Sequence, residues 1–155
     1  MSKHSDDCET CKRNSDRSQW GAGPWDNEPE NRIEFEHAGL PCILHRGCGG
    51  AWCGYVGLST SHPAHGKDYD DVNVEVHGGL TYGEACQGHI CHVPKPGEPE
   101  DLHWFGFDCN HAWDIAPGMA RHFSMSPEMM DMVYRDVNYA KAETMRLAEQ
   151  LAAMA

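Results

Sequence analysis

The chain has 155 residues, with 12 basic and 24 acidic side chains and a formal net charge of −12 at pH 7. This length suits one domain with a real core, and the 16 Gly and 9 Pro predict many tight turns. The acidic balance argues against partners that need clustered Lys and Arg, namely a nucleic-acid polymer or an anionic membrane surface. A small phosphorylated ligand stays compatible with it, because a single pocket can be locally positive.

The hydropathy pattern points to a cytoplasmic protein. No apolar run approaches the roughly 18 residues that a membrane span needs, and the polar N-terminus lacks the apolar core of a secretory signal. In that compartment the eight Cys are expected to stay reduced or to bind metal.

Residues 1–31 are polar and charged, and we expect a disordered or draped tail whose end is anchored by Trp20 and Trp25. The tail contains Cys8 and Cys11 in a CxxC motif, which is either half of a zinc site or a pair of free thiols. From residue 32 to residue 155 we expect a single α+β domain.

Alternating apolar and polar residues predict several strands. Three of them, over residues 32–36, 42–46 and 51–58, are joined by short Gly-containing turns and predict an antiparallel meander. Residues 72–77, VNVEVH, alternate most clearly, and residues 103–108, HWFGFD, form another expected strand. The fold is therefore predicted as a small antiparallel sheet of about five to six strands, packed by one long C-terminal helix.

That helix is predicted over residues 127–154. Ser126 is a good N-cap and Pro127 suits the first helical position. The apolar seam at alternating spacings of three and four consists of Met130, Val133, Val137, Ala140, Thr144, Leu147, Leu151 and Met154. We expect the seam to pack across the sheet, and the alternative is a coiled-coil homodimer.

Three motifs occur in the order HPxHGKxYDDVxVxVHGGLTY, ICHVPxPGEPxD and WFGFDCxHxxD. Through them the chain, from about residue 25 to residue 151, resembles a family of small uncharacterised proteins from actinobacterial phages and their hosts. In similar sequences the C-terminal helix begins near a YRD segment, here residues 134–136. The resemblance implies a phage accessory protein, of the kind that counters host defence or adjusts host metabolism, and it carries over no catalytic residue.

The spacing of Asp108, His111 and Asp114 at a predicted strand end marks a candidate site. His and Asp together suit Zn, Mn or Fe, and they also serve as general base and orienting carboxylate. His77 precedes two glycines, where backbone N–H groups can meet an anion. We take His77, Asp108 and His111 as candidate catalytic residues and Asp114 as a candidate metal ligand. The alternative is a structural turn beside a His on a solvated face.

Two further groups have the spacing of metal ligands. His62 and His65 would close over the same site as His77 and Asp108, or else are exposed loop histidines. A structural zinc site is predicted from Cys86, His89 and Cys91, completed by Cys48 or Cys53. In the alternative reading these thiols are buried and act as small hydrophobic side chains.

Aromatic rings and the few cations of the domain supply candidate ligand contacts, by stacking on a base or sugar and by pairing with phosphate. These candidates are Arg46, Tyr55, Lys67, Tyr69 and Trp104.

Three functions remain open from the sequence. One is metal-dependent hydrolysis of a small, nucleotide-like substrate, and another is binding of such a ligand without chemistry. The third is a zinc-stabilised interaction protein that engages a host protein through its acidic surface or its C-terminal helix. Polar groups and glycines that recur at strand ends favour a small-ligand site, while turnover and binding are not separated.

Overall fold

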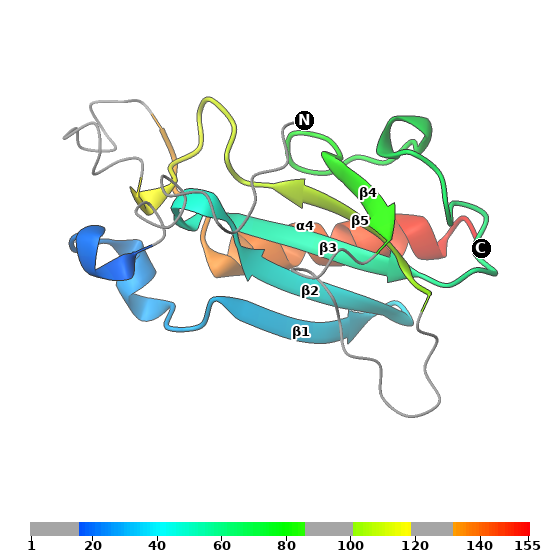
Figure 1. Ribbon diagram of the computed structural model, residues 1–155, viewed down its shortest axis with the longest axis horizontal. Helices are drawn as coiled ribbons and strands as arrows, with labels where there is room; N and C mark the ends of the chain where they lie inside the picture. The colour runs from blue at the N-terminus through cyan, green and yellow to red at the C-terminus, as the bar shows by residue number, and fades with distance from the viewer. Residues whose placement is uncertain (1–15, 86–100, 119–131) are drawn as a thin grey trace.

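A five-stranded antiparallel sheet in the order β1-β2-β3-β5-β4 forms the centre of the fold, with one long helix against it (Figure 1). The computed structural model describes residues 16–85, 101–118 and 132–155. The strands are β1 (Arg32–His37), β2 (Leu40–Arg46), β3 (Trp52–Leu58), β4 (Tyr82–Ala85) and β5 (His103–Asp108), and the helix is α4 (Val137–Ala152). Short 3-10 turns lie at η1 (Arg17–Gln19), η2 (Pro24–Asn27), η3 (Cys48–Gly50) and η4 (Tyr69–Asp71). The predicted α+β fold is confirmed.

The β1–β2 hairpin shows how the local sequence sets the register. Its two-residue loop, Ala38–Gly39, has positive φ at both positions, 54° and 78°. This is the turn geometry that matches the twist of a tight hairpin. It places Phe35 opposite Cys42 and Ile33 opposite Leu44, and Cys42 and Leu44 lie in the buried cluster beneath α4.

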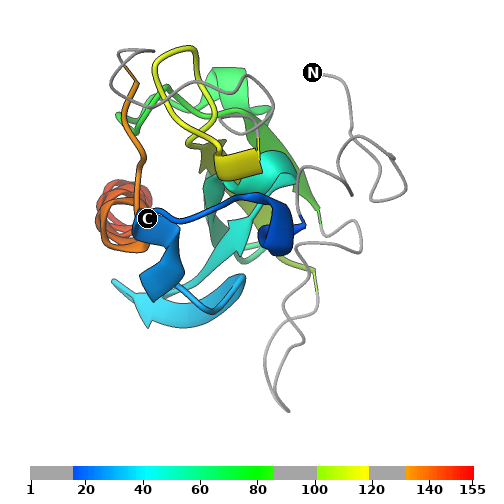
Figure 2. The ribbon, with the colours of Figure 1, turned by 90° about the vertical axis from the view of Figure 1, so that its left-hand side faces the viewer.

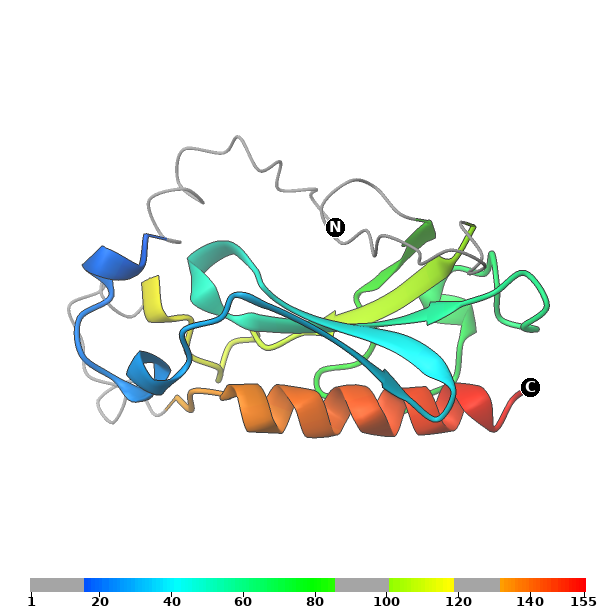
Figure 3. The ribbon, with the colours of Figure 1, turned by 90° about the horizontal axis from the view of Figure 1, so that it is seen from below.

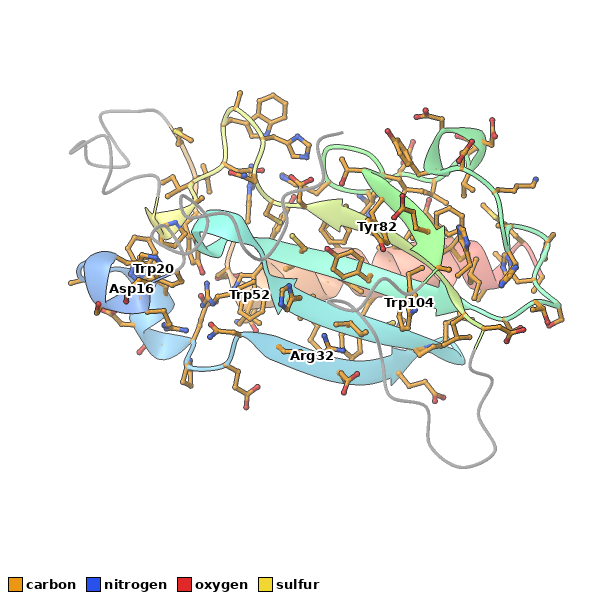
Figure 4. The ribbon with its side chains drawn as sticks, viewed as in Figure 1. Asp16, Trp20, Arg32, Trp52, Tyr82 and Trp104 are labelled. Carbon is orange, nitrogen blue, oxygen red and sulfur yellow. The ribbon has the colours of Figure 1, made fainter. Side chains whose placement is uncertain are left out.

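The two faces of the sheet bury different side chains. The face toward α4 holds Phe105 and Phe107, and the opposite face holds Trp104 with Ile43 and Tyr55. This is the alternation predicted for residues 103–108. Figure 2 looks down α4 and shows the helix against one face of the sheet. Figure 4 labels Trp104 over the opposite face, toward the viewer.

Helix α4 packs its apolar seam along the sheet (Figure 3). The buried positions of the helix are Ala140, Thr144, Leu147, Ala148 and Leu151. Gly54 in β3 makes the close approach possible, because a Cβ there would lie 2.1 Å from Thr144 Oγ1. The seam positions inside the helix therefore face the sheet of the same chain, whereas Val133 and Met154, also predicted for the seam, lie outside α4 and are exposed. Among the described residues, no helix combines the length and the apolar character needed to cross a bilayer.

The start of the helix corrects the predicted boundary near residue 127. Asp136 is the N-cap, and its side chain accepts a hydrogen bond from the Tyr139 backbone N–H at 2.8 Å. Residues 132–136 are extended, because Val133 exchanges backbone hydrogen bonds with Trp113 and Ile115, both at 2.9 Å. The helix thus begins directly after the YRD segment, and the predicted cap at residues 126–127 lies outside the described residues.

Residues 72–76 are extended but belong to no strand, which corrects the clearest alternation in the sequence. The side-chain amide of Gln150 in α4 bonds both backbone groups of Glu75, each at 2.8 Å. The alternating valines pack against the core beneath α4, with Val76 buried. The segment therefore shows the two-residue period of a strand while its backbone pairs with a helix side chain. The fifth strand is β4 instead, at the sheet edge.

Candidate functional site

His77 and Asp114 form a buried pair where the segment after residue 72 meets the turn that follows β5. His77 Nε2 lies 2.7 Å from Asp114 Oδ2, and both side chains are almost fully buried. His77 Nδ1 lies 2.8 Å from the Tyr139 hydroxyl on the first turn of α4. Since a carboxylate only accepts hydrogen bonds, Nε2 carries a proton. In the neutral ring, Nδ1 therefore accepts from Tyr139.

Asp114 is the centre of this network. Burial by itself would raise the pKa of its carboxyl group. Hydrogen bonds from His77, from the His111 backbone N–H and from Arg135 outweigh that effect and lower the pKa below 3.8. Asp114 is therefore an anion at neutral pH, held by three donors from three segments of the chain.

Tyr139 connects the buried pair to the surface. Burial raises the pKa of its hydroxyl group, and the neighbouring carboxylate of Glu143 raises it further. The hydroxyl therefore keeps its proton at neutral pH and donates a hydrogen bond to His77 Nδ1. A protonated phenol can donate one hydrogen bond and accept others.

Arg135 closes the network on the side of α4. Its Nε donates to Asp114 Oδ1 at 3.0 Å, and its guanidinium carbon lies 4.8 Å from the centre of the Tyr139 ring. The two terminal nitrogens make no hydrogen bond within the part of the chain that the structure describes. Asp114 and Tyr139 therefore hold a partly exposed guanidinium whose fork is available to an anion.

His111 extends the site toward β5. Its Nε2 lies 3.6 Å from Asp108 Oδ1, which is too far for a hydrogen bond, and this buried nitrogen has no partner among the described residues. Thr81 and the backbone N–H of Asn110 hold the Asp108 carboxylate, at 2.9 and 3.1 Å. Gly78, at φ +68°, passes so close that a Cβ there would lie 1.9 Å from His111 Nε2. The glycine therefore makes room for the imidazole.

The rings of the site form a continuous strip. The His111 ring stacks on Trp113 at 6.0 Å and meets His77 edge-on at 5.5 Å, and His77 meets Tyr139 at 5.3 Å. Trp113 is 55% exposed and is one of three large apolar side chains exposed in the described residues. The indole of Trp113 and the guanidinium of Arg135 are linked through the rings of His111 and His77 and the carboxylate of Asp114. Such a pair is suited to a ligand with both a flat ring and a negative charge.

Of the predicted site residues, His77, Asp108, His111 and Asp114 come together, but His62 and His65 lie elsewhere. His62 is buried; its Nε2 bonds the Leu151 carbonyl at 2.7 Å and its Nδ1 accepts from Ala64 N–H. His62 contacts α4 at Leu151, whereas His77 contacts it at Tyr139. These two positions are twelve residues apart in the helix, which is about 18 Å along its axis. The predicted single constellation of His62 with His77 is therefore wrong.

Arg46 is a structural residue and not a free ligand contact. Its guanidinium is 3.0 Å from Glu28 Oε1, both side chains are buried, and it stacks on Trp52 at 4.4 Å. Glu28 also accepts hydrogen bonds from the Tyr134 hydroxyl and from the first backbone N–H of α4 at Val137. The sequence suggested that Arg46 contacts a ligand, because the sequence alone does not show that the Glu28 carboxylate is buried beside it.

Glu28 belongs to the segment predicted as a tail. In residues 16–31, Trp20 and Trp25 are 5% and 6% exposed and pack with Ile115. Figures 1 and 3 show η2 beside the N-terminal end of α4 and η1 at the same end of the molecule, and Figure 4 labels Trp20 at this end. Residues 16–31 therefore belong to the folded domain.

The remaining candidate contacts are spread over the domain. Tyr55 and Trp104 are buried on the sheet face opposite α4, and Tyr69 packs partly buried on the core. Lys67 is exposed, and its carbonyl accepts from His103 at 3.1 Å. These residues do not surround His77, so the predicted stacking set is not a single site.

The thiols of the described residues are poorly suited to react or to bind metal. Burial raises the pKa of Cys42 to about 12 and that of Cys53 to about 12, and the charge of Asp108 adds to the effect on Cys53. No group of three or more His, Cys, Asp or Glu side chains in residues 16–85, 101–118 and 132–155 is arranged to hold a metal ion. The zinc ligands predicted at Cys86, His89 and Cys91 lie outside those residues.

Sequence reasoning missed Tyr139 and Arg135 as site residues. Tyr139 lies off the apolar seam of the helix, and Arg135 lies in the YRD segment, which was noted only as a resemblance. The available signal was the scarcity of cations, 12 in the whole chain, which gives each one more weight. No family model, curated protein or solved structure matches the chain.

Proposed function

We propose that the chain binds a small anionic ligand with a flat ring, of nucleotide type, at the site formed by His77, His111, Trp113, Arg135 and Tyr139. In the setting that the phage resemblance implies, this would be an accessory protein that sequesters such a ligand in the host cytoplasm. The observation that carries the proposal is the Arg135 guanidinium, held through Nε by Asp114 with both terminal nitrogens unbonded within the described chain.

The energetics favour an anion at Arg135. The guanidinium forms two parallel hydrogen bonds with a phosphate or carboxylate, and such charge-assisted bonds are about twice as strong as neutral ones. Asp114 is already committed to three donors, so its charge is largely neutralised locally. A net charge of −12 repels anions from the rest of the surface, which makes this position selective.

Tyr139 gives the site a hydroxyl group at the outer end of the hydrogen-bonded series Tyr139–His77–Asp114. The hydroxyl donates to His77 Nδ1, and His77 Nε2 donates to Asp114 Oδ2. These hydrogen bonds orient the Tyr139 hydroxyl oxygen so that it can accept a hydrogen bond from an O–H or N–H group of the ligand.

Calorimetric titration of the full chain with AMP, adenosine and inorganic phosphate tests the proposal. We expect AMP to bind, and both adenosine and phosphate to bind more weakly, because each lacks one of the two recognition elements. Replacing Arg135 with Gln should weaken AMP binding by at least about tenfold, because a single charge-assisted hydrogen bond is worth that much and the substitution removes two. Arg146→Gln, which changes an exposed Arg on α4 that pairs with Glu143, should leave the affinity unchanged.

A second measurement separates binding from turnover. The chain is incubated with AMP, denatured, and the ligand analysed by chromatography. Recovery of intact AMP supports sequestration. Release of adenosine, adenine or phosphate would instead show that the same site catalyses a reaction. Equal affinity in wild type and Arg135→Gln, or no binding of any probe, would overturn the proposal.

The alternative of a zinc-stabilised interaction protein is a proposal of a different class. It depends on Cys86, His89 and Cys91, which lie outside the described residues. Chelation separates the two. Loss of the fold on chelation, with no ligand effect on the melting temperature, would favour the interaction protein.

A further inference from the structure

A second pair of histidines lies at the end of β5 opposite to the ligand site. His103 is the first residue of β5 and Asp108 is its last, so the two ends are about 17 Å apart along the strand. His65, from the loop after β3, brings its ring to 5.5 Å from that of His103 between centroids, at an angle of 56°. The sequence had grouped His65 with His62, but the fold pairs it with His103.

The two rings are held by reciprocal hydrogen bonds. His65 Nε2 bonds the carbonyl of Asp101 at 2.8 Å, two residues before His103. His103 Nε2 bonds the carbonyl of Lys67 at 3.1 Å, two residues after His65. A carbonyl only accepts, so each Nε2 carries a proton. In the neutral rings both Nδ1 atoms then have an open lone pair, and neither bonds another group in the described part of the chain.

A ring nitrogen with a lone pair, opposite an N–H donated to a carbonyl, is the usual arrangement of a metal-binding His. Two imidazoles on one tetrahedral zinc ion, each bound at about 2 Å, have centroids about 5 Å apart, close to the separation seen here. His103 is 8% exposed, and its ring packs against Phe105 at 4.9 Å between centroids, so this imidazole is largely shielded from solvent. The carboxylates of Asp68 and Glu84 act on His103 electrostatically and favour a cation beside it.

We propose that His65 and His103 together bind one transition-metal ion such as Zn²⁺ through their Nδ1 atoms. The pair supplies two protein ligands, and water completes the coordination shell. With two protein ligands, the ion exchanges with solvent and is not a structural centre. The site is independent of the ligand site at His77.

Titration of the full chain with Zn²⁺ at pH 7, followed by ¹⁵N NMR of the histidine rings, tests this assignment. The ring signals show which nitrogen binds, so zinc taken up by the many thiols of the chain does not mimic the result. We expect the Nδ1 signals of His65 and His103 to shift together, with a single ion shared by the two rings. His65→Gln should weaken zinc binding at His103 by about tenfold or more.

His37→Gln is the matched control, because His37 is a partly exposed His whose Nε2 is bonded to Glu149, and its loss should leave zinc binding at the pair unchanged. Backbone amide spectra confirm that each variant folds. The proposal is overturned if excess Zn²⁺ moves neither Nδ1 signal of the pair, or moves only one of them. In those cases the reciprocal hydrogen bonds would be a structural clasp, which His65→Gln would weaken without any effect on zinc.

Discussion

Replacing Glu28 with Ala should strongly destabilise the domain, although the sequence places this residue in a polar segment. The Glu28 and Arg46 side chains are 6% and 3% exposed and lie 3.0 Å apart. Removing one partner of a buried ion pair costs about 3–5 kcal/mol, because the other charge stays buried and uncompensated. The Val137 N–H at the start of α4 also loses its acceptor, 2.5 Å away, which adds about 1 kcal/mol.

The expected loss of about 4–6 kcal/mol is a large part of the 5–15 kcal/mol typical of a domain. Urea unfolding followed by Trp fluorescence measures it well, since Trp20 and Trp52 flank Arg46 at 5.4 and 4.4 Å. Heating should show a fall in melting temperature of roughly 10–20 °C, from 2–4 °C per kcal/mol at this size.

Glu30→Ala is the control, because Glu30 is exposed two residues away and should change stability by less than about 0.5 kcal/mol. Replacing the pair with apolar residues, as in Glu28→Leu with Arg46→Met, should recover much of the loss. A loss below about 1 kcal/mol in Glu28→Ala would refute the reasoning, since it would put the pair in the range of exposed salt bridges.

Three further predictions test the packing and the site. Gly54→Ala should lower the free energy of unfolding by at least about 1–3 kcal/mol. The new Cβ would lie 2.1 Å from Thr144 Oγ1 and force α4 away from the sheet. An unchanged urea midpoint would contradict this contact. Gln150→Ala should cost about 1–3 kcal/mol for two hydrogen bonds and speed amide exchange at Glu75, whereas unaltered exchange would show that the segment is held by other means. Asp114 has a lowered pKa in the folded state, so its contribution to stability is present above pH 3.8 and is lost as the pH falls through the folded value. Asp114→Asn should therefore be less stable at pH 7 and lose less on acidification, and parallel stability curves for the two proteins would rule out this linkage.

Local patterns in the sequence were enough for most of the sheet. The alternation in residues 32–36, 42–46, 51–58 and 103–108 places one side of each segment in a core, and those segments are strands. The pattern failed at residues 72–76 because alternation reports which side chains are buried and not what the backbone bonds to. Gln150, 75 residues further along, supplies the partner.

The helix boundary shows the same limit. Ser126 and Pro127 are good start signals in isolation, but Asp136 is equally good, and the choice depends on whether the chain before it is needed elsewhere. Val133 pairs beside Asp114, so residues 132–136 are extended and the later cap is the one used.

What the sequence determined by itself was the α+β class, most strands, the apolar seam of the helix and the group of His77, Asp108, His111 and Asp114. These depend on local periodicity or on the short spacing of three of the four residues. Only the tertiary structure decided that Arg46 is paired with Glu28, that His65 meets His103, and that Arg135 and Tyr139 complete the site. The physical reason is that hydrogen bonds and ion pairs act over a few ångströms in space. Their partners here lie between 18 and 62 residues apart along the chain, where no local pattern reports them.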